Sequence, residues 1–527
     1  MKNRWIGNLM IVIILGSLLA ACSTDSKEPA NEQDALEAEN ETGGDLNIAV
    51  TAQPPTLDTH LTTATIALQI GRNIFETLVT QNETYEAVPM LAESIENSED
   101  GLTYTFNLRQ DVKFHNGKEM TSEDVVASMN RWLEQSSRAK MLLSGAVFEA
   151  EDSYTVILTL ENRASDVLDI MAGQGQFPAI MPKEVIESAS EDGINEYIGT
   201  GPFQFEEWRQ DQYIHLVKYE DYQSVDGEPS GLAGKKEVLV DNLYYQIVTD
   251  SSTRIAGLQT GEYDVAEAIA PDNYEQLKSM SNVDIHLYLS GSNTMFYNKK
   301  EGIMTDRKMR QAINAILDMD EIMLASFANE DLYVMDPGYM SPDQTNWSSD
   351  AGSESFNQKD LEKGKKLLEE ANYNGEEIRL VSTRDYDYNY NAAIVVKEQL
   401  EQAGVNVNLE VYDWTSLLEH IADPENWDIR FVGIGYVTTP SQLLPLSASN
   451  PGWPDDEKVT ALLDEIRGSA TQADAENLWD ELQAYLWNDY VPISLFGHYS
   501  AIIGAVDNLE GFKTFQGSIP WNTKVIE

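Results

Sequence analysis

Segment 378–433 alternates strand patterns with helical patterns, and this alternation constrains the fold more than any other feature of the sequence. Residues 378–382, 405–411 and 429–433 have strand patterns, and 389–403 and 414–422 between them carry a helical pattern. Parallel neighbours in a sheet need a crossover connection, which is usually a helix. The order strand–helix–strand–helix–strand therefore predicts an α/β fold with a largely parallel sheet.

The loops that follow these predicted strands are the first place to expect ligand contacts. In open α/β sheets, ligands bind beyond the carboxyl ends of the strands. The loops in question are residues 383–390, 412–415 and 434–440.

The remainder of the sequence also predicts mixed α and β structure. Residues 46–50 and 103–108 have strand patterns, and residues 66–74 carry isoleucine at every fourth position, as one face of a helix requires. Thr121, with Asp124 three residues on, predicts the capped start of another helix. We find no repeat of fixed period, which argues against solenoids and propellers.

The N-terminus has the pattern of a secretory signal. Lys2 and Arg4 precede an apolar run that extends to about Ala21. That run is shorter than the roughly 20 residues that a membrane-spanning helix needs, so residues 1–21 are predicted to be a signal peptide.

Cys22 is the only cysteine in 527 residues, which excludes an internal disulfide, a zinc finger and an iron–sulfur site. It follows Leu19-Ala20-Ala21, and this segment resembles the lipobox of bacterial lipoproteins. We expect Cys22 to be the lipid attachment site, carrying acyl chains such as palmitate, and to become the first mature residue. An ordinary signal peptide beside a free thiol is the alternative. Residues 22–44 are acidic, lack aromatic residues and are predicted to be a disordered tether.

The charge balance restricts the partners of the protein. The chain has 35 basic and 88 acidic residues, spread along its length. This charge argues against binding of nucleic acid or of an anionic lipid surface through such a face. It predicts a solvated acidic surface suited to a saline or alkaline exterior.

A search for catalytic and metal-binding patterns finds no complete motif. The six histidines are scattered, and neither H-E-x-x-H nor G-x-S-x-G occurs. Residues 231–236 depart from a phosphate loop, and residues 385–396 depart from a calcium loop because Tyr390 and Val396 replace its glycine and glutamate. We therefore expect no enzymatic activity, no metal and no cofactor.

Several short segments occur in the order that one known family shows. They are Thr56–Asp58, Ile74–Leu78, Pro89–Glu93, Tyr104–Phe106 with Leu108 and Arg109, Val112–Gly117, Thr121–Val126, Gly199–Phe203, and Arg307 with Arg310–Ile313. On these segments the body, from Leu46 to Val525, resembles the extracytoplasmic solute-binding proteins of family 5, which serve oligopeptide, dipeptide and nickel importers. Most of the segments also have a plain structural interpretation, such as the Asn116-Gly117 turn.

The resemblance implies a two-lobed fold of the periplasmic-binding-protein type (type II) with an additional third domain. Lobe I would comprise residues 45–88, 201–288 and 496–527. Domain II would be residues 89–200, and lobe III residues 289–495. A ligand would lie between lobes I and III, and binding would close the hinge.

The resemblance also implies a function. The chain would be the lipid-anchored, extracellular subunit of an ABC importer, a monomer that captures peptides and delivers them to the permease. The alternatives are a non-peptide solute (a metal chelate, an oligosaccharide or a modified amino acid) and a sensor or adhesion lipoprotein that keeps the fold.

The expected ligand residues combine the strand-end loops with the resemblance. Peptide-binding members typically have Gly-Trp and then an aspartate for the peptide ammonium, where this chain has Ile434 and then Val437 or Thr438. Trp414 matches a tryptophan that walls the ligand pocket in the family, although a core role is equally consistent with its position. We expect recognition by aromatic contacts and neutral hydrogen bonds. The predicted ligand residues are Gln53, Thr56, Tyr386, Trp414, Tyr436, Thr438 and Trp453.

Overall fold

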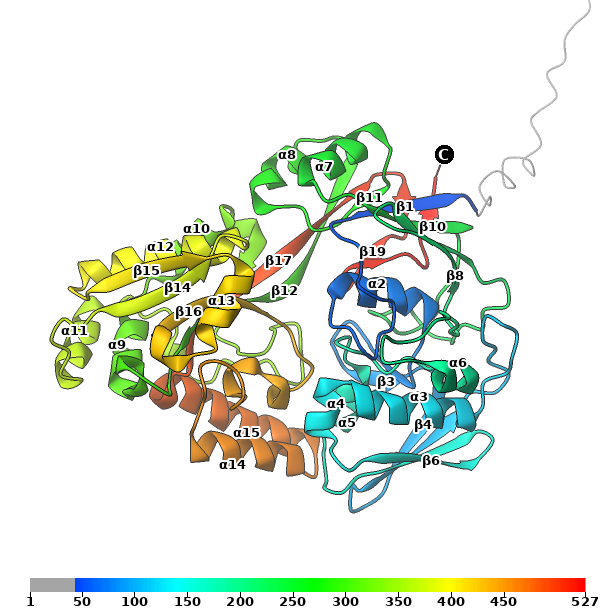
Figure 1. Ribbon diagram of the computed structural model, residues 1–527, viewed down its shortest axis with the longest axis horizontal. Coiled ribbons are helices and arrows are strands. Elements are labelled where there is room, and N and C mark those ends of the chain that lie inside the picture. The colour runs from blue at the N-terminus through cyan, green and yellow to red at the C-terminus, as the bar shows by residue number, and fades with distance from the viewer. Residues whose placement is uncertain (1–42, 527) are drawn as a thin grey trace, which may run out of the picture. The chain divides into compact units, whose positions relative to one another are not determined.

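The computed structural model of the chain describes residues 43–526 (Figure 1). The predicted signal peptide, Cys22 and all of the predicted tether except Gly43 and Gly44 lie outside the described residues. Within residues 43–526, no helix has both the length and the apolar character needed to cross a membrane.

The parallel sheet predicted in lobe III is confirmed. Strand β14 (Ile378–Thr383) pairs in parallel with both β15 (Val407–Tyr412) and β16 (Ile429–Gly435). Helices α12 (Asp387–Gln402) and α13 (Trp414–Ile421) provide the crossovers.

Two long antiparallel strands join lobe III to lobe I. They are β12 (Val283–Tyr297) and β17 (Ile493–Val506), which run side by side through the middle of the structure (Figure 1). The second half of β12 pairs with β16, from Gly291 opposite Gly435 onward. Because of these two strands, one eleven-stranded sheet extends through both lobes.

Lobe I contains the other end of this sheet. The predicted first strand is confirmed as β1 (Asp45–Val50), which pairs in parallel with β10 (Asn242–Ile247). The predicted helix is confirmed as α2 (Thr65–Ile74), where Ile70 and Ile74 are fully buried. The remaining strands of the large sheet are β8 (Phe203–Arg209), β9 (Tyr213–Lys218), β11 (Val265–Ala266) and β13 (Tyr333–Val334).

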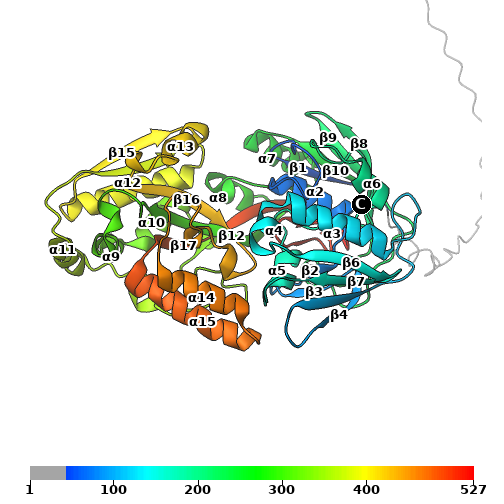
Figure 2. The same ribbon diagram turned by 60° about the horizontal axis from the view of Figure 1, so that its bottom comes forward.

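Domain II has a sheet and a hydrophobic core of its own (Figure 2). Its strands are β4 (Ala92–Asn97), β5 (Thr103–Leu108), β7 (Thr155–Thr159) and β6 (Val147–Asp152), in that spatial order. Thr121 and Asp124 form the predicted capping box at the start of α3 (Ser122–Gln135). Trp132 of this helix is buried in the core, as its apolar spacing predicted.

The other elements complete the three regions. The helices are α4 (Ser137–Leu142), α5 (Val167–Ala172), α6 (Lys183–Ser188), α7 (Ser251–Thr260), α8 (Tyr274–Lys278), α9 (Arg307–Ile316), α10 (Met319–Phe327), α11 (Leu361–Glu370), α14 (Glu457–Gly468) and α15 (Gln472–Tyr485). The strands are β2 (Val79–Gln81), β3 (Ala87–Pro89), β18 (Leu509–Glu510), β19 (Lys513–Thr514), β20 (Ser518–Ile519) and β21 (Lys524–Val525).

Domain II and lobe III are joined by direct hydrogen bonds. Asp166, just before α5, accepts a hydrogen bond of 2.6 Å from the Ser441 hydroxyl and forms an ion pair of 3.3 Å with Arg467 at the end of α14. The Ser165 amide donates to the Arg467 carbonyl over 2.8 Å. The α/β architecture is thus confirmed, whereas the residue boundaries of the three regions stay a prediction.

Candidate ligand site

Three adjoining chambers lie where the regions meet, among the cavities of residues 43–526. A central chamber of about 210 Å³ borders a side chamber of about 80 Å³ and a deep chamber of about 20 Å³, and all three share Gln174 as a lining residue. The central chamber is lined by Thr63, Thr65, Leu68, Gln69, Arg72, Gln174, Gly175, Tyr288, Leu289, Ser290, Gly435, Tyr436 and Gln516. We refer to the three together as the interlobe chambers.

The chain topology explains why these residues meet. Helix α2 of lobe I provides one wall, the crossing strand β12 another, and the end of β16 in lobe III a third. The pairing of β12 with β17 shifts register between Leu289 and Gly291, so Ser290 has no partner in this ladder among the described residues. Such a bulge frees the backbone amide and carbonyl of one residue from the sheet.

Gly435, the last residue of β16, leaves the central chamber open. A Cβ atom added at this position would meet no described atom within 4 Å. Its absent side chain therefore contributes space to the chamber.

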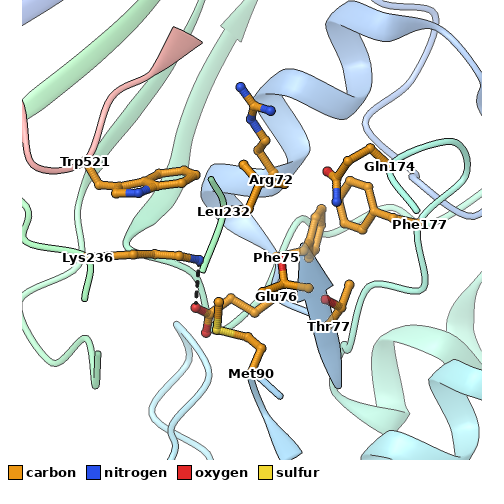
Figure 3. A pocket seen from close by; sticks show the side chains of 11 residues that line it. Arg72, Phe75, Glu76, Thr77, Met90, Gln174, Phe177, Leu232, Lys236 and Trp521 are labelled. Carbon is orange, nitrogen blue, oxygen red and sulfur yellow. Dashed lines mark hydrogen bonds and ion pairs between the residues drawn. The ribbon is translucent and has the colours of Figure 1, made fainter. Parts of the chain in front are cut away.

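The deep chamber contains a buried ion pair (Figure 3). Lys236 Nζ lies 3.2 Å from Glu76 Oε1, and both side chains are at most 4 % exposed. The Glu76 carboxylate also accepts hydrogen bonds from Tyr222 (2.7 Å) and Thr200 (3.0 Å), and Lys236 Nζ lies 4.8 Å from the centre of the Trp521 ring. Burial lowers the pKa of the Lys236 ammonium, and the Glu76 carboxylate opposes that effect.

Arg72 separates the deep chamber from the central one. Its guanidinium donates to the carbonyls of Phe515 (2.9 Å), Gln516 (3.3 Å) and Ser518 (2.6 Å), which ties α2 to the C-terminal segment. Its Nε atom has no hydrogen-bond partner among the described residues. Burial lowers the pKa of this guanidinium.

Tyr436, the residue after β16, lines both the central and the side chamber, and its contact with a ligand stays a prediction. Its hydroxyl lies 2.9 Å from His498 Nδ1, and that nitrogen is also 3.1 Å from the Ser292 hydroxyl. Burial lowers the pKa of His498 to about 4, so the imidazole is neutral at physiological pH. Burial also raises the pKa of Tyr436, so this side chain remains a neutral hydrogen-bonding group.

Thr438 is the second predicted residue that the structure brings to the chambers. It is buried in the wall of the side chamber, where its hydroxyl and its amide both donate to Gln442 Oε1 over 3.1 Å.

Gln53 and Thr56 lie outside the lining of the interlobe chambers. Gln53 Oε1 accepts from the Asp211 amide (2.8 Å) and from Trp208 Nε1 (3.3 Å) at the β8–β9 turn. Thr56 caps its own turn by accepting from the Asp58 amide. A ligand role for these two residues stays a prediction.

The three remaining predicted residues are also not part of that lining. Trp414 stacks edge-on against Tyr386 at 5.1 Å and packs on the small core between α13 and β14. Trp453 packs against Trp427 at 5.8 Å, beside the same core. Tyr386 is 42 % exposed. A ligand role for these aromatic residues likewise stays a prediction.

Sequence reasoning missed the residues that other regions contribute. Arg72, Gln174, Ser290 and Gln516 belong to a helix, a loop, a crossing strand and the C-terminal segment, with no motif that links them. Only Arg72 could have been suspected from the sequence, because it is a cation in the last turn of a helix that is otherwise uncharged. Within residues 43–526, no group of three His, Cys, Asp or Glu side chains is placed to hold a metal ion.

Comparison with known proteins identifies the family of the chain. Residues 86–454 match the profile described as bacterial extracellular solute-binding proteins, family 5 Middle. The chain is 26 % identical to the oligopeptide-binding protein AppA of Bacillus subtilis (strain 168), over 97 % of both chains. It is 28 % identical to the probable peptide ABC transporter periplasmic-binding protein y4tO of Sinorhizobium fredii (strain NBRC 101917 / NGR234), over 82 % of this chain and 84 % of that one.

A solved structure shows the same fold. The substrate-binding protein CtaP of Listeria monocytogenes superposes with a TM-score of 0.78 at 22 % identity, covering 89 % of this chain and 95 % of that one. The family profile covers more than half of the present chain. The chain therefore belongs to the family 5 bacterial extracellular solute-binding proteins.

Proposed function

We propose that this protein is the lipid-anchored receptor of an ABC importer, that it captures peptides outside the cytoplasmic membrane, and that it acts without catalysis. The observation that carries the proposal is the set of interlobe chambers, lined jointly by lobe I, domain II and lobe III. A solute held there contacts several regions at once, so its binding favours the arrangement in which they meet.

The lining of the central chamber suits a peptide main chain. An extended peptide is recognised largely through backbone hydrogen bonds, with pockets for alternate side chains. Ser290 at the bulge of β12 offers backbone groups outside the β12–β17 ladder, and Gln69, Gln174 and Gln516 offer side-chain amides. Two relatives whose names refer to peptides are similar over most of this chain, which supports the same class of solute.

The anchor and the permease complete the proposal. Cys22 in its lipobox-like segment would hold the protein at the outer face of the membrane. The acidic residues after Cys22 would then link the anchor to the binding domains, to which Gly43 is already tied because its amide donates to the Leu239 carbonyl over 2.8 Å.

Peptide capture is tested with the protein as purified. The protein is denatured, the released small molecules are identified by mass spectrometry, and binding is then measured by native mass spectrometry against a peptide digest, a panel of oligosaccharides and a panel of metal chelates. We expect peptides to be released and rebound. Binding of oligosaccharides or chelates with no binding of peptides would refute the proposal.

A further inference from the structure

Arg138, at the start of α4 in domain II, is an arginine whose guanidinium has no protein partner. It lines the side chamber and is partly buried, yet it makes no hydrogen bond and no ion pair within residues 43–526. Its guanidinium lies against Gly175, where a Cβ atom would come within 2.9 Å of Nη1.

The other arginines of the described residues are all engaged. Each donates at least one hydrogen bond, as Arg72, Arg109, Arg131, Arg163, Arg209, Arg254, Arg307, Arg310, Arg379, Arg384, Arg430 and Arg467 show. A buried charge without a partner is costly, and buried cations are accordingly paired or hydrogen-bonded in most proteins. Arg138 is half-buried and none of its nitrogens is fully buried, so its guanidinium stays accessible in the side chamber and free to receive a group from outside the chain.

The charged residues that line the chambers indicate the sign of the charge on the group that would bind there. The chain has a formal net charge of −53. The lining of the three chambers nevertheless contains the cations Arg72, Arg138 and Lys236, and among the described residues Glu76 is its one carboxylate, already paired with Lys236. A cationic cavity in a strongly acidic protein favours an anionic group on the ligand.

We propose that Arg138 receives a carboxylate of the bound solute in the side chamber. The planar guanidinium presents paired N–H donors that match the two oxygens of a carboxylate, and the resulting bonds are charge-assisted. The inference rests on the proposed function, since for a peptide the carboxylate is either the C-terminus or the side chain of an acidic residue. It differs from the sequence-based expectation that recognition depends on neutral groups alone.

The side chamber has room for such a group beside neutral hydrogen-bonding residues. Tyr85, Gln174, Tyr436 and Thr438 line it together with Arg138, and no acidic residue of the described chain belongs to its lining. A carboxylate there would meet one cation among the lining residues, while the Asp343 carboxylate lies near Tyr85 and Tyr436, outside the lining.

The probe is a tryptic protein digest, used untreated and after methyl esterification, which neutralises every carboxylate. Peptides retained by the wild-type protein are identified by native mass spectrometry. We expect esterification to reduce retention at least tenfold. Arg138→Gln should reduce retention from the untreated digest by a similar factor and abolish the difference between the two digests.

Two further variants separate position from charge. Gly175→Ala keeps the charge but places a methyl group where the guanidinium lies, so it should weaken retention while Arg138 is still present. Arg209→Gln is the matched control, because it removes one positive charge from an exposed arginine that pairs with Glu207 outside the chambers. It should bind as the wild type does. Arg138→Gln should melt no lower than the wild type, since it breaks no internal hydrogen bond.

The best-retained peptide is then synthesised as its C-terminal amide and with Asp or Glu replaced by Asn or Gln. Loss of binding with the amide assigns the terminal carboxylate to Arg138, and loss with the side-chain variants assigns an acidic residue. Equal retention of both digests by the wild type would overturn the carboxylate inference and leave peptide capture standing. Retention of no peptide from either digest would refute peptide capture itself, and the inference with it.

Discussion

Removing the Lys236 ammonium from the deep chamber should destabilise the protein strongly. Glu76 is 1 % exposed at its side chain and Lys236 is 4 % exposed, so Lys236→Met leaves an unpaired carboxylate with almost no exposure to bulk solvent. Breaking a buried ion pair in this way costs about 3–5 kcal/mol. The lower half of that range applies here, because Tyr222 and Thr200 still donate to the carboxylate.

The cost is measurable as a change in melting temperature. Residues 43–526 form one compact unit with a sheet that extends through both lobes, so an unfolding entropy of about 2.1 cal/mol/K per residue sums to about 1 kcal/mol/K, and about 3 kcal/mol lowers Tm by roughly 3 °C. Differential scanning calorimetry would compare Lys236→Met with the double variant Glu76→Gln/Lys236→Met. The double variant removes both charges and should regain part of the loss, because the remaining amide needs no counter-charge.

The matched control is Lys235→Met, at the adjacent position. Lys235 is 54 % exposed and pairs with Glu237 at the surface, where such pairs contribute about 0–1 kcal/mol. A Lys236→Met protein that melts within about 1 °C of the control, or a double variant no more stable than the single one, would contradict the reasoning.

Four more outcomes follow from the structure and the sequence. Gly435→Leu should lower peptide affinity at least tenfold in calorimetric titrations without lowering Tm, because the new side chain enters open space in the central chamber. Burial and the neighbouring Asp166 carboxylate raise the pKa of Asp169 to about 7. As pH rises, Asp169 loses its proton in the unfolded protein before it does in the folded one, so the free energy of unfolding should fall between about pH 4 and 7. Asp169→Asn should flatten that part of a curve of Tm against pH. Cys22→Ser should release the protein into the medium or leave uncleaved precursor, and normal processing with unchanged membrane association on fractionation would contradict the lipobox interpretation. Raising the concentration of a chloride salt from low to molar should raise Tm, because the salt screens the repulsion among 88 acidic residues. A Tm that does not change with salt would contradict the prediction that the acidic surface is suited to a saline exterior.

Helices and strands whose pattern is complete within one short segment could be predicted from the sequence. The period of apolar residues predicted α2, α3 and the parallel unit β14–α12–β15–α13–β16, because burial of one face imposes that period on each segment. Thr121 and Asp124 predicted the start of α3, since a capping box is complete within four residues.

The candidate site was only partly accessible to such reasoning. Tyr436 and Thr438 were found because they follow a predicted strand at the edge where ligands bind. Trp414 and Trp453 have the same residue type as a pocket wall, but they pack beside the core between α13 and β14. Aromatic character indicates burial, and it does not distinguish a wall from a core.

The sequence by itself determined part of the secondary structure, the α/β class and the family, because each rests on neighbouring residues or on short segments in a fixed order. Only the tertiary structure decided which side chains share a chamber. Arg72, Arg138, Ser290 and Tyr436 come from four separate segments, and their meeting depends on the path of β12 and β17 through the sheet. Whether a guanidinium is satisfied is likewise a property of distant partners: Arg72 finds three carbonyls near the C-terminus, and Arg138 finds no partner in the described chain.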